Sequence, residues 1–207
     1  VLHELGYLIS GSDINENSNI VRLKKLGISI KIGHKKKNLN KVSIAVISSA
    51  IDSKNKELKA ARENNIPIVH RSEMLSELMR LKWSIAVAGT HGKTTTTSII
   101  SSILFHAGLD PTVINGGIIN TWNSNARLGS GEWMVVEADE SDGSFSKFSP
   151  TVAIVTNIDR EHLDFHGSFK NLEKSFQNFV SSIPFYGFKV LCIDHPIVQK
   201  LIPQNKD

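Results

Sequence analysis

A glycine-rich turn joins an apolar strand to a helix near the middle of the chain. The run 84–88 predicts a buried strand, Gly89-Thr90-His91-Gly92-Lys93-Thr94 follows directly, and residues 94–106 predict a helix that ends at Gly108. Glycines let the backbone turn so that successive N–H groups point into one concavity, and the start of the helix adds positive potential there. This order predicts a phosphate-binding loop at the edge of an α/β sheet.

The side chains of this turn suit phosphate and a divalent cation. Lys93 supplies a positive charge for the outer phosphates, and the hydroxyls of Thr94 and Thr95 are placed for phosphate and Mg²⁺. The general phosphate-loop pattern has glycine six residues before the lysine, where this chain has Val87. Its first glycine is Gly89, so the loop is a shortened one.

The rest of the chain alternates strand and helix patterns, which predicts an α/β fold with a parallel sheet. Strands are expected at residues 7–9, 28–32, 42–47, 66–69, 84–88, 133–138, 152–156 and 188–193, with a turn at 10–13 and helices at 16–26, 54–63, 72–81, 94–106 and 171–182. We expect two abutting domains, 1–82 and 83–207. The first has the pattern of a Rossmann-like domain whose opening strand and glycine turn would precede Val1.

Composition excludes several classes of protein. With 207 residues, of which 40% are hydrophobic, the chain can bury a core, so a disulfide-stapled miniprotein or a disordered tail is excluded. The net charge is +4, and its tightest basic cluster, Lys35 to Lys37, has the length of a solvated loop and not of a nucleic-acid-binding face. No apolar run is long enough to span a membrane.

The single cysteine indicates the redox compartment of the protein, and the first residues indicate whether the chain is complete. Cys192 excludes a disulfide framework, fits a reducing compartment and is expected in the core of the last strand. The chain has no signal peptide at its start and opens on Val1 without a methionine, so we expect it to be part of a longer protein.

Carboxylates gather where the strand at 133–138 ends. Glu137 continues the apolar run and is expected to be partly shielded, and Asp139, Glu140 and Asp142 follow it. Ligands bind beyond the carboxyl ends of strands in open α/β sheets, which is where the phosphate loop lies. A carboxylate at this edge is therefore a candidate ligand of phosphate-bound Mg²⁺.

A histidine-containing segment follows the next strand, 152–156. It carries His162 and His166, and we expect one of the two to be a metal ligand. Mg²⁺ prefers oxygen ligands, so an imidazole suggests tolerance of Mn²⁺ or a second metal ion.

Together these motifs resemble the Mur ligases, the ATP-dependent amide-forming enzymes of peptidoglycan precursor synthesis. The resemblance covers essentially the whole chain, and it is nearest to the branch of the family that adds L-alanine. It is carried by the shortened loop at 89–95, by Val136 to Phe145, by Thr156 to Asp159 with His162 to Asp164, by Asn125 to Gly129, and by residues 66–67 and 71–75.

The resemblance implies a fold and a set of roles. The fold is a Rossmann-like UDP-sugar domain followed by part of a phosphate-loop ATPase domain, without the family's C-terminal amino-acid-binding domain. Residues 89–95 would hold ATP, Thr94 and Glu137 one Mg²⁺, and His162 a second, with Lys93, Glu137 and His162 as the catalytic set. The substrate path implied for the UDP-sugar comprises Asp13, Ser49, Asn115, Gly116 and Gly117.

The implied activity is ATP-dependent ligation of L-alanine to the lactyl carboxylate of UDP-N-acetylmuramate through an acyl phosphate. The family works in the bacterial cytoplasm without nucleic acid, membrane or an obligate protein partner, and this chain alone is expected to be inactive. Two alternatives stay open. One is a related ligase, of the murein-tripeptide recycling or folylpolyglutamate type. The other is a non-catalytic nucleotide-binding module, which would need Lys93 but not both Glu137 and His162.

Overall fold

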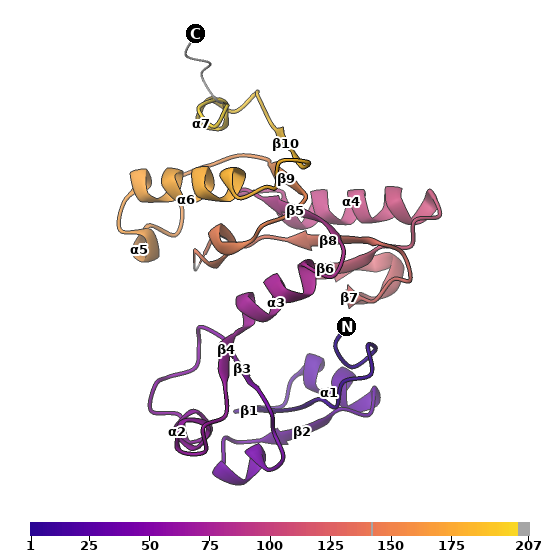
Figure 1. Ribbon diagram of the computed structural model, residues 1–207, viewed down its shortest axis with the longest axis vertical. Coiled ribbons are helices and arrows are strands. Elements are labelled where there is room, and N and C mark those ends of the chain that lie inside the picture. Colours follow the sequence, from indigo (N-terminus) through magenta and orange to yellow (C-terminus); the bar gives the residue numbers. More distant parts are fainter. Residues whose placement is uncertain (142, 203–207) are drawn as a thin grey trace. The chain divides into compact units, whose positions relative to one another are not determined.

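The computed structural model describes residues 1–141 and 143–202, which form two compact units (Figure 1). The first unit ends at Met74 and the second begins at Leu75, inside helix α3 (Arg71–Met79). This division precedes the boundary expected after Lys82 because Leu75, Leu78 and Met79 pack into the core of the second unit.

The first unit contains two separate pairs of parallel strands. The pairs are β1 (Ser10–Asp13) with β2 (Ser29–Ile32), and β3 (Ala45–Ile47) with β4 (Ile68–His70). Its helices are α1 (Ser18–Lys25), the 3₁₀ turn η1 (Lys36–Leu39) and α2 (Lys56–Glu63). The expectation of a strand at 7–9 and a turn at 10–13 is wrong. Pairing with β2 makes the Ser-Gly-Ser-Asp segment extended despite its low strand propensity, and Leu8 is fully exposed.

The second unit is built on one six-stranded sheet in the order β10-β9-β5-β8-β6-β7. All its neighbouring strands are parallel except β6 and β7, which run antiparallel. The strands are β5 (Trp83–Ala88), β6 (Thr112–Ile119), β7 (Ser124–Arg127), β8 (Trp133–Glu137), β9 (Val152–Val155) and β10 (Phe188–Leu191). The predicted parallel α/β class is confirmed. Strands β6 and β7 were not predicted, since glycine and asparagine interrupt their apolar residues.

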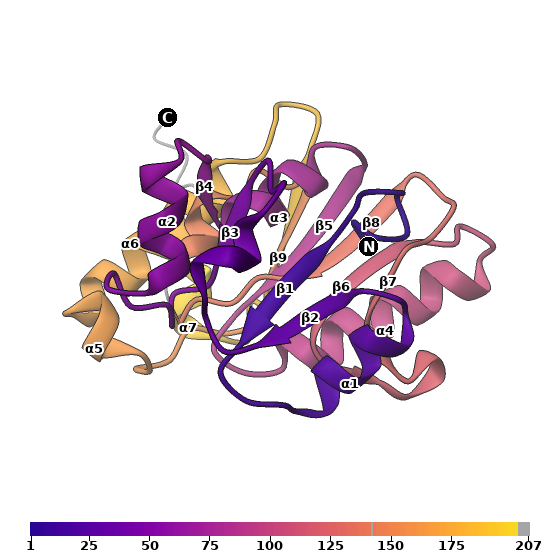
Figure 2. The ribbon, with the colours of Figure 1, turned by 90° about the horizontal axis from the view of Figure 1, so that it is seen from below.

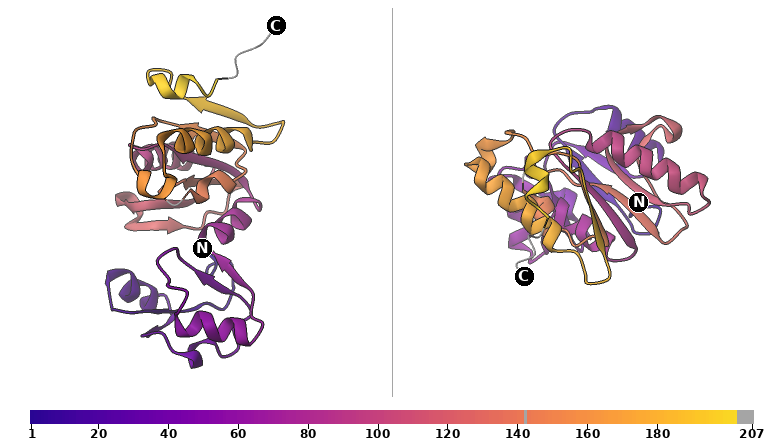
Figure 3. Two further views of the ribbon diagram at one scale, coloured as in Figure 1. Left: turned by 90° about the vertical axis from the view of Figure 1, so that its left-hand side faces the viewer. Right: turned by 90° about the horizontal axis from the view of Figure 1, so that it is seen from above.

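Helices cover both faces of this sheet (Figures 2 and 3). Alternate strand residues point to opposite faces. Ile85, Val135 and Val152 pack under α4 (Lys93–His106). Ala86 and Ala88 belong to the larger core on the other face, which α6 (Phe169–Ser181) covers with Phe176 and Phe179, both completely buried. The remaining elements are η2 (Asn120–Trp122), η3 (Ser144–Lys147), α5 (Leu163–His166) and α7 (Pro196–Gln199).

The central strands of the sheet deliver their carboxyl ends to one edge. Strand β5 lies between β8 and β9, so the segments that follow Ala88, Glu137 and Val155 are neighbours. Strand β10 ends at Leu191, which leaves Cys192 exposed beyond it and makes the core prediction for this cysteine wrong. Among the described residues, no helix has the length and apolar character to cross a membrane.

Candidate nucleotide site

The turn between β5 and α4 has a backbone that glycine makes possible. Gly89 has φ +143° and Gly92 has φ +79°, both in the region that side chains disfavour. A Cβ on Gly89 would also lie 2.0 Å from the Thr156 hydroxyl oxygen. Gly89 therefore lets the loop pass directly against the segment that follows β9.

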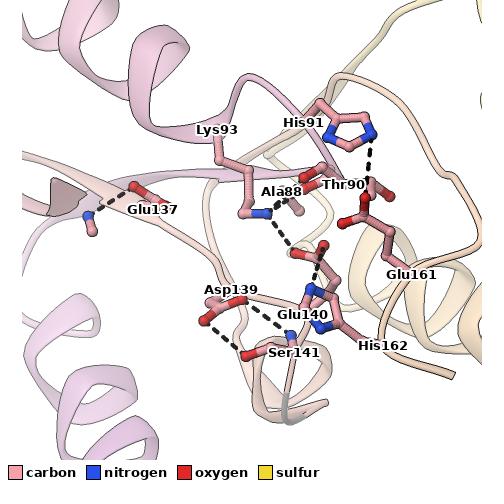
Figure 4. A network of polar contacts seen from close by, with 12 residues as sticks. Ala88, Thr90, His91, Lys93, Glu137, Asp139, Glu140, Ser141, Glu161 and His162 are labelled. Carbon is pink, nitrogen blue, oxygen red and sulfur yellow. Dashed lines mark hydrogen bonds and ion pairs between the residues drawn. The ribbon is translucent and has the colours of Figure 1, made fainter. Parts of the chain in front are cut away.

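The Lys93 side chain folds back over its own loop. Its ammonium donates to the carbonyls of Gly89 (2.7 Å) and Thr90 (3.1 Å) and lies 2.8 Å from Glu140 Oε2 (Figure 4). The Lys93 side chain is 12% exposed and that of Glu140 is 1% exposed. The loop lysine thus has a buried counter-ion at the sheet edge.

Thr94 and Glu137, which the sequence places at the same edge of the sheet, are in direct contact. The Thr94 hydroxyl donates to Glu137 Oε2 (2.9 Å), and the Gly116 N–H donates to the same oxygen (2.7 Å). Gly116 admits the carboxylate because a Cβ there would lie within 3.0 Å of its atoms. Strand β6, which the sequence pattern missed, therefore holds Glu137 in place.

Asn157 clamps the phosphate loop, a role that the sequence reasoning missed. Its side chain accepts from the His91 N–H (2.7 Å) and donates to the His91 carbonyl (2.9 Å), and its own carbonyl accepts from the Thr90 N–H (3.1 Å). Two loop N–H groups are thus already used. The first backbone bond of α4 runs from Thr96 to Gly92, which leaves the N–H groups of Lys93, Thr94 and Thr95 outside the helical ladder.

The loop histidine faces acidic groups and not the loop interior. His91 Nε2 lies 3.6 Å from Asp159 Oδ2 and 3.7 Å from Glu161 Oε1, and His195 Nε2 lies 3.4 Å from Asp159 Oδ1. The Asp159 N–H also donates to the Thr90 hydroxyl (2.8 Å). The segment after β9 therefore holds both Thr90 and His91 from one side.

Of the two histidines that are candidate metal ligands, His166 has a structural role. His166 is buried, and its Nε2 lies 2.9 Å from the Glu140 carbonyl, so it supports the acidic segment. His162 is 38% exposed, and its Nε2 lies 3.8 Å from Glu140 Oε1. Asp142, a candidate carboxylate, lies outside the described residues, and Asp139 binds the Ser141 N–H (3.1 Å) and hydroxyl (2.9 Å).

The site has oxygen atoms that can ligate a cation, but its side chains alone do not complete a coordination shell. Within residues 1–141 and 143–202, no three His, Cys, Asp or Glu side chains are close enough to hold a metal ion by themselves. The Thr94 hydroxyl and the Glu137 carboxylate converge, and these are the oxygen ligands that Mg²⁺ takes when phosphate and water complete its shell.

Comparison with known proteins decides the family. The description "Mur ligase family, catalytic domain" matches residues 1–83, and "Mur ligase middle domain" matches residues 87–207. The chain belongs to the Mur ligase family.

Among curated Mur ligases, the chain is similar to enzymes named UDP-N-acetylmuramate–L-alanine ligase. It is 60% identical to that of Rhodospirillum rubrum and 61% identical to that of Granulibacter bethesdensis, over all 207 residues in both cases. The chain spans 43% of the length of each of these relatives.

Solved Mur ligase structures share the fold. UDP-N-acetylmuramate:L-alanyl-gamma-D-glutamyl-meso-diaminopimelate ligase of Neisseria meningitides is 27% identical with a TM-score of 0.89, covering 97% of this chain and 68% of that one. UDP-N-acetylmuramate-alanine ligase of Thermotoga maritima is 32% identical with a TM-score of 0.87, covering 97% and 47%.

The positions predicted for the sugar substrate fall in both units of this Mur ligase chain. Asp13 ends β1 and Ser49 follows β3, each beyond the carboxyl end of a parallel strand of the first unit. In the second unit, Gly116 and Gly117 lie on β6 beside Glu137 and Thr94. The Asn115 amide is buried and donates to the Ser98 hydroxyl (3.0 Å), so it fastens β6 to α4.

A half-buried polar cluster lies next to Asp13. The Ser12 hydroxyl donates to Glu57 Oε2 (2.6 Å), the Asn38 amide donates to Glu57 Oε1 (2.5 Å), and His34 Nδ1 lies 3.1 Å from Oε2. Burial raises the pKa of Glu57, but the hydrogen bonds from Ser12, Asn38 and His34 outweigh it and hold that pKa below its ordinary value. This ionised carboxylate ties α2 to the carboxyl ends of β1 and β2.

Proposed function

We propose that this chain is part of an enzyme that uses ATP to join L-alanine to the lactyl carboxylate of UDP-N-acetylmuramate. The observation that carries the proposal is the half-buried Lys93 at the loop together with the Thr94–Glu137 pair, in a chain about 60% identical to L-alanine ligases throughout. A glycine turn that only joined strand to helix would need neither the lysine nor the paired carboxylate.

In this proposal the nucleotide phosphates lie at the start of α4. The N–H groups of Lys93, Thr94 and Thr95 point beyond the helical ladder and carry the positive end of the helix dipole. The Lys93 ammonium adds a full charge. The side chains of Thr90 and His91 hold the loop to the segment after β9, so the part of these residues in ATP binding is to shape the loop.

Mg²⁺ fits the donor set of the site. We assign one ion to Thr94 and Glu137 and a second to His162, and Mn²⁺ suits the imidazole ligand. When bound, the ions neutralise charge on the transferring phosphoryl group. The chain's own contribution is to hold Glu137 by the Gly116 N–H and Lys93 by the loop carbonyls before any substrate arrives.

The reaction needs ATP because a carboxylate is a poor electrophile. A lactyl carboxylate oxygen attacks the γ-phosphorus, the bond to the bridging oxygen breaks, and ADP leaves. The alanine amine then attacks the carbonyl carbon of the acyl phosphate, inorganic phosphate leaves, and the amine gives up a proton. These reactants are anions that repel each other, and Lys93 with the helix start offsets that repulsion.

The remaining assignments follow the same proposal. Residues 1–82 form the sugar-nucleotide domain with Asp13 and Ser49, and residues 83–207 form the ATP domain with Asn115, Gly116 and Gly117 along the substrate path. The partners are the two substrates, without nucleic acid, membrane or an obligate protein, in the bacterial cytoplasm. The amino-acid-binding part belongs to the longer protein.

An amino-acid-dependent phosphate-release assay on the full-length protein tests the proposal. With UDP-N-acetylmuramate and ATP, phosphate release should depend on L-alanine and should produce UDP-N-acetylmuramoyl-alanine. The alternative reaction, of the murein-tripeptide recycling type, would use a tripeptide in place of alanine. Release driven by the tripeptide and not by alanine would favour that alternative.

A further inference from the structure

Glu140 is the most deeply buried ionisable side chain of the site. It is fully buried, and its two oxygens face Lys93 (2.8 Å) and His162 (3.8 Å) (Figure 4). In the described part of the chain, neither oxygen receives a well-aligned hydrogen bond. Buried carboxylates normally accept several, so this one calls for a partner beyond those present.

Lys93 is surrounded by three oxygens. Its ammonium donates hydrogen bonds to the carbonyls of Gly89 and Thr90, and the carboxylate of Glu140 lies 2.8 Å away as its ion-pair partner. A phosphate oxygen competes with these three oxygens for the ammonium. The two carbonyls are neutral and the Glu140 carboxylate is charged, so Glu140 is the strongest competitor of phosphate for Lys93.

The Glu140 backbone is held by two contacts to its carbonyl, and its side chain is fully buried, so the carboxylate stays at the site when Lys93 turns. The Glu140 carbonyl accepts from the Gly143 N–H (3.0 Å) and lies 2.9 Å from His166 Nε2, and His166 is itself buried. A carboxylate that cannot follow Lys93 into solvent becomes an unpaired buried charge, which is costly unless a cation replaces the ammonium. His162, the residue proposed for the second cation, lies on its other side.

We propose that Glu140 is a positioning residue shared by two states of the site. In the free protein it is the counter-ion that holds Lys93 against the loop. When Lys93 engages phosphate, the Glu140 carboxylate draws the divalent cation to the His162 side. The inference rests on the proposed nucleotide function and adds that nucleotide and cation binding are coupled through this one side chain.

The test is Glu140→Gln in the full-length protein, with two binding measurements. Calorimetry in EDTA gives the affinity for ATP alone, and electron paramagnetic resonance gives the Mn²⁺ concentration for half-saturation in the presence of ATP. Glutamine keeps the shape but removes the charge that competes with phosphate for Lys93. We expect metal-free ATP to bind about fivefold tighter or better, and half-saturation by Mn²⁺ to need about fivefold more ion, the lower range of coupling between bound groups.

Opposite changes in the affinities for ATP and Mn²⁺ distinguish the proposal from a purely structural ion pair. Loss of such a pair would weaken both affinities or leave both unchanged. Asp164→Asn is the matched control, since it removes one exposed carboxylate of the neighbouring helix without touching Lys93. It should change both affinities less than about twofold. If Glu140→Gln does not fold, Glu140→Asp, which draws the charge back by one methylene, should shift both quantities in the same directions by less.

Two results would overturn different claims. If Glu140→Gln binds metal-free ATP no tighter than the wild type, while Lys93→Met loses ATP, the role given to Glu140 is wrong. If the wild type binds no ATP, or Lys93→Met binds it equally well, the proposed nucleotide function itself fails.

Discussion

The Thr94 hydroxyl donates to Glu137 Oε2 over 2.9 Å and so joins the first turn of α4 to the end of β8. The two residues are far apart in the sequence, and the Gly116 N–H from a third element completes the contact. A carboxylate that accepts two hydrogen bonds on one oxygen is held in position, and its other oxygen stays available for a ligand. Glu137 is therefore set in place before substrate binds.

Glu137→Ala tests this arrangement in the full-length protein. We expect ligation to be abolished, because the proposed cation loses its carboxylate, while the affinity for the UDP-sugar stays within about threefold. Turnover is measured by phosphate release and sugar affinity by calorimetry. Asp139→Asn is the control, since within residues 1–141 and 143–202 that carboxylate accepts hydrogen bonds from Ser141, and its loss should leave turnover near normal. Loss of sugar binding with normal turnover in Glu137→Ala would contradict the assignment.

Gly89→Ala should disrupt the loop by sterics as well as by backbone strain. The new Cβ would meet the Thr156 hydroxyl oxygen at 2.0 Å, on a φ of +143°. We expect the free energy of unfolding to fall by about 2–3 kcal/mol, with ATP binding lost. Gly108→Ala isolates the strain, because its φ is +79° and nothing lies within 4 Å, and it should cost only about 1 kcal/mol. Equal costs in denaturant titrations would show that Thr156 yields to the Cβ.

Asn157→Ala should loosen the loop without touching ATP. The variant loses both side-chain hydrogen bonds to the His91 backbone, each worth about 1 kcal/mol, so ATP affinity should fall about tenfold or more. Asn64→Ala removes an asparagine hydrogen bond to the Ala60 carbonyl in the first unit and should leave ATP affinity unchanged. An Asn157→Ala protein that binds ATP normally would mean that the loop holds its shape by itself.

The Glu57 cluster should make the stability of the first unit sensitive to acid. Its folded pKa lies below the ordinary value, so the ionised carboxylate stabilises the fold above about pH 5, and this stability is lost as pH falls through the folded pKa. Glu57→Gln should raise hydrogen exchange of the α2 amides at pH 7, by an amount equivalent to about 1–3 kcal/mol. The difference from wild type should shrink as pH falls through the folded pKa of Glu57 and should vanish in acid, where the wild-type carboxylate is protonated.

Glu63→Gln is the control for that experiment. Glu63 forms an exposed pair with Lys36 (2.9 Å), and such pairs contribute less than about 1 kcal/mol. Its exchange should match wild type at pH 7 and in acid. A Glu57→Gln difference that persisted at low pH would show that shape, and not charge, holds the cluster together.

The elements with strong patterns were predictable. The apolar run before Gly89 is buried on both sides of the sheet, so its composition alone marks a central strand, and the phosphate loop could be placed at its carboxyl end. Strand β6 was not predictable, because Asn115, Gly116 and Gly117 have low strand propensity. Its extended form comes from pairing with β8, a contact between distant segments.

The candidate site likewise has a part that the sequence predicts and a part that depends on tertiary structure. The residue types and spacing of Gly89 to Thr94, with Glu137 at a strand end, were enough to predict a phosphate-binding edge, because the succession of strand, glycine turn and helix and the direction of the helix dipole follow from local pattern. Only the tertiary structure decided which acid pairs with Lys93. Sequence reasoning expected Glu137 to be partly shielded, and Glu137 is half-buried. It did not single out Glu140, which is fully buried because the turn after β8 and the packing of His166 direct it inward. Local pattern brings charged groups to an edge, and long-range packing determines which of them loses its water.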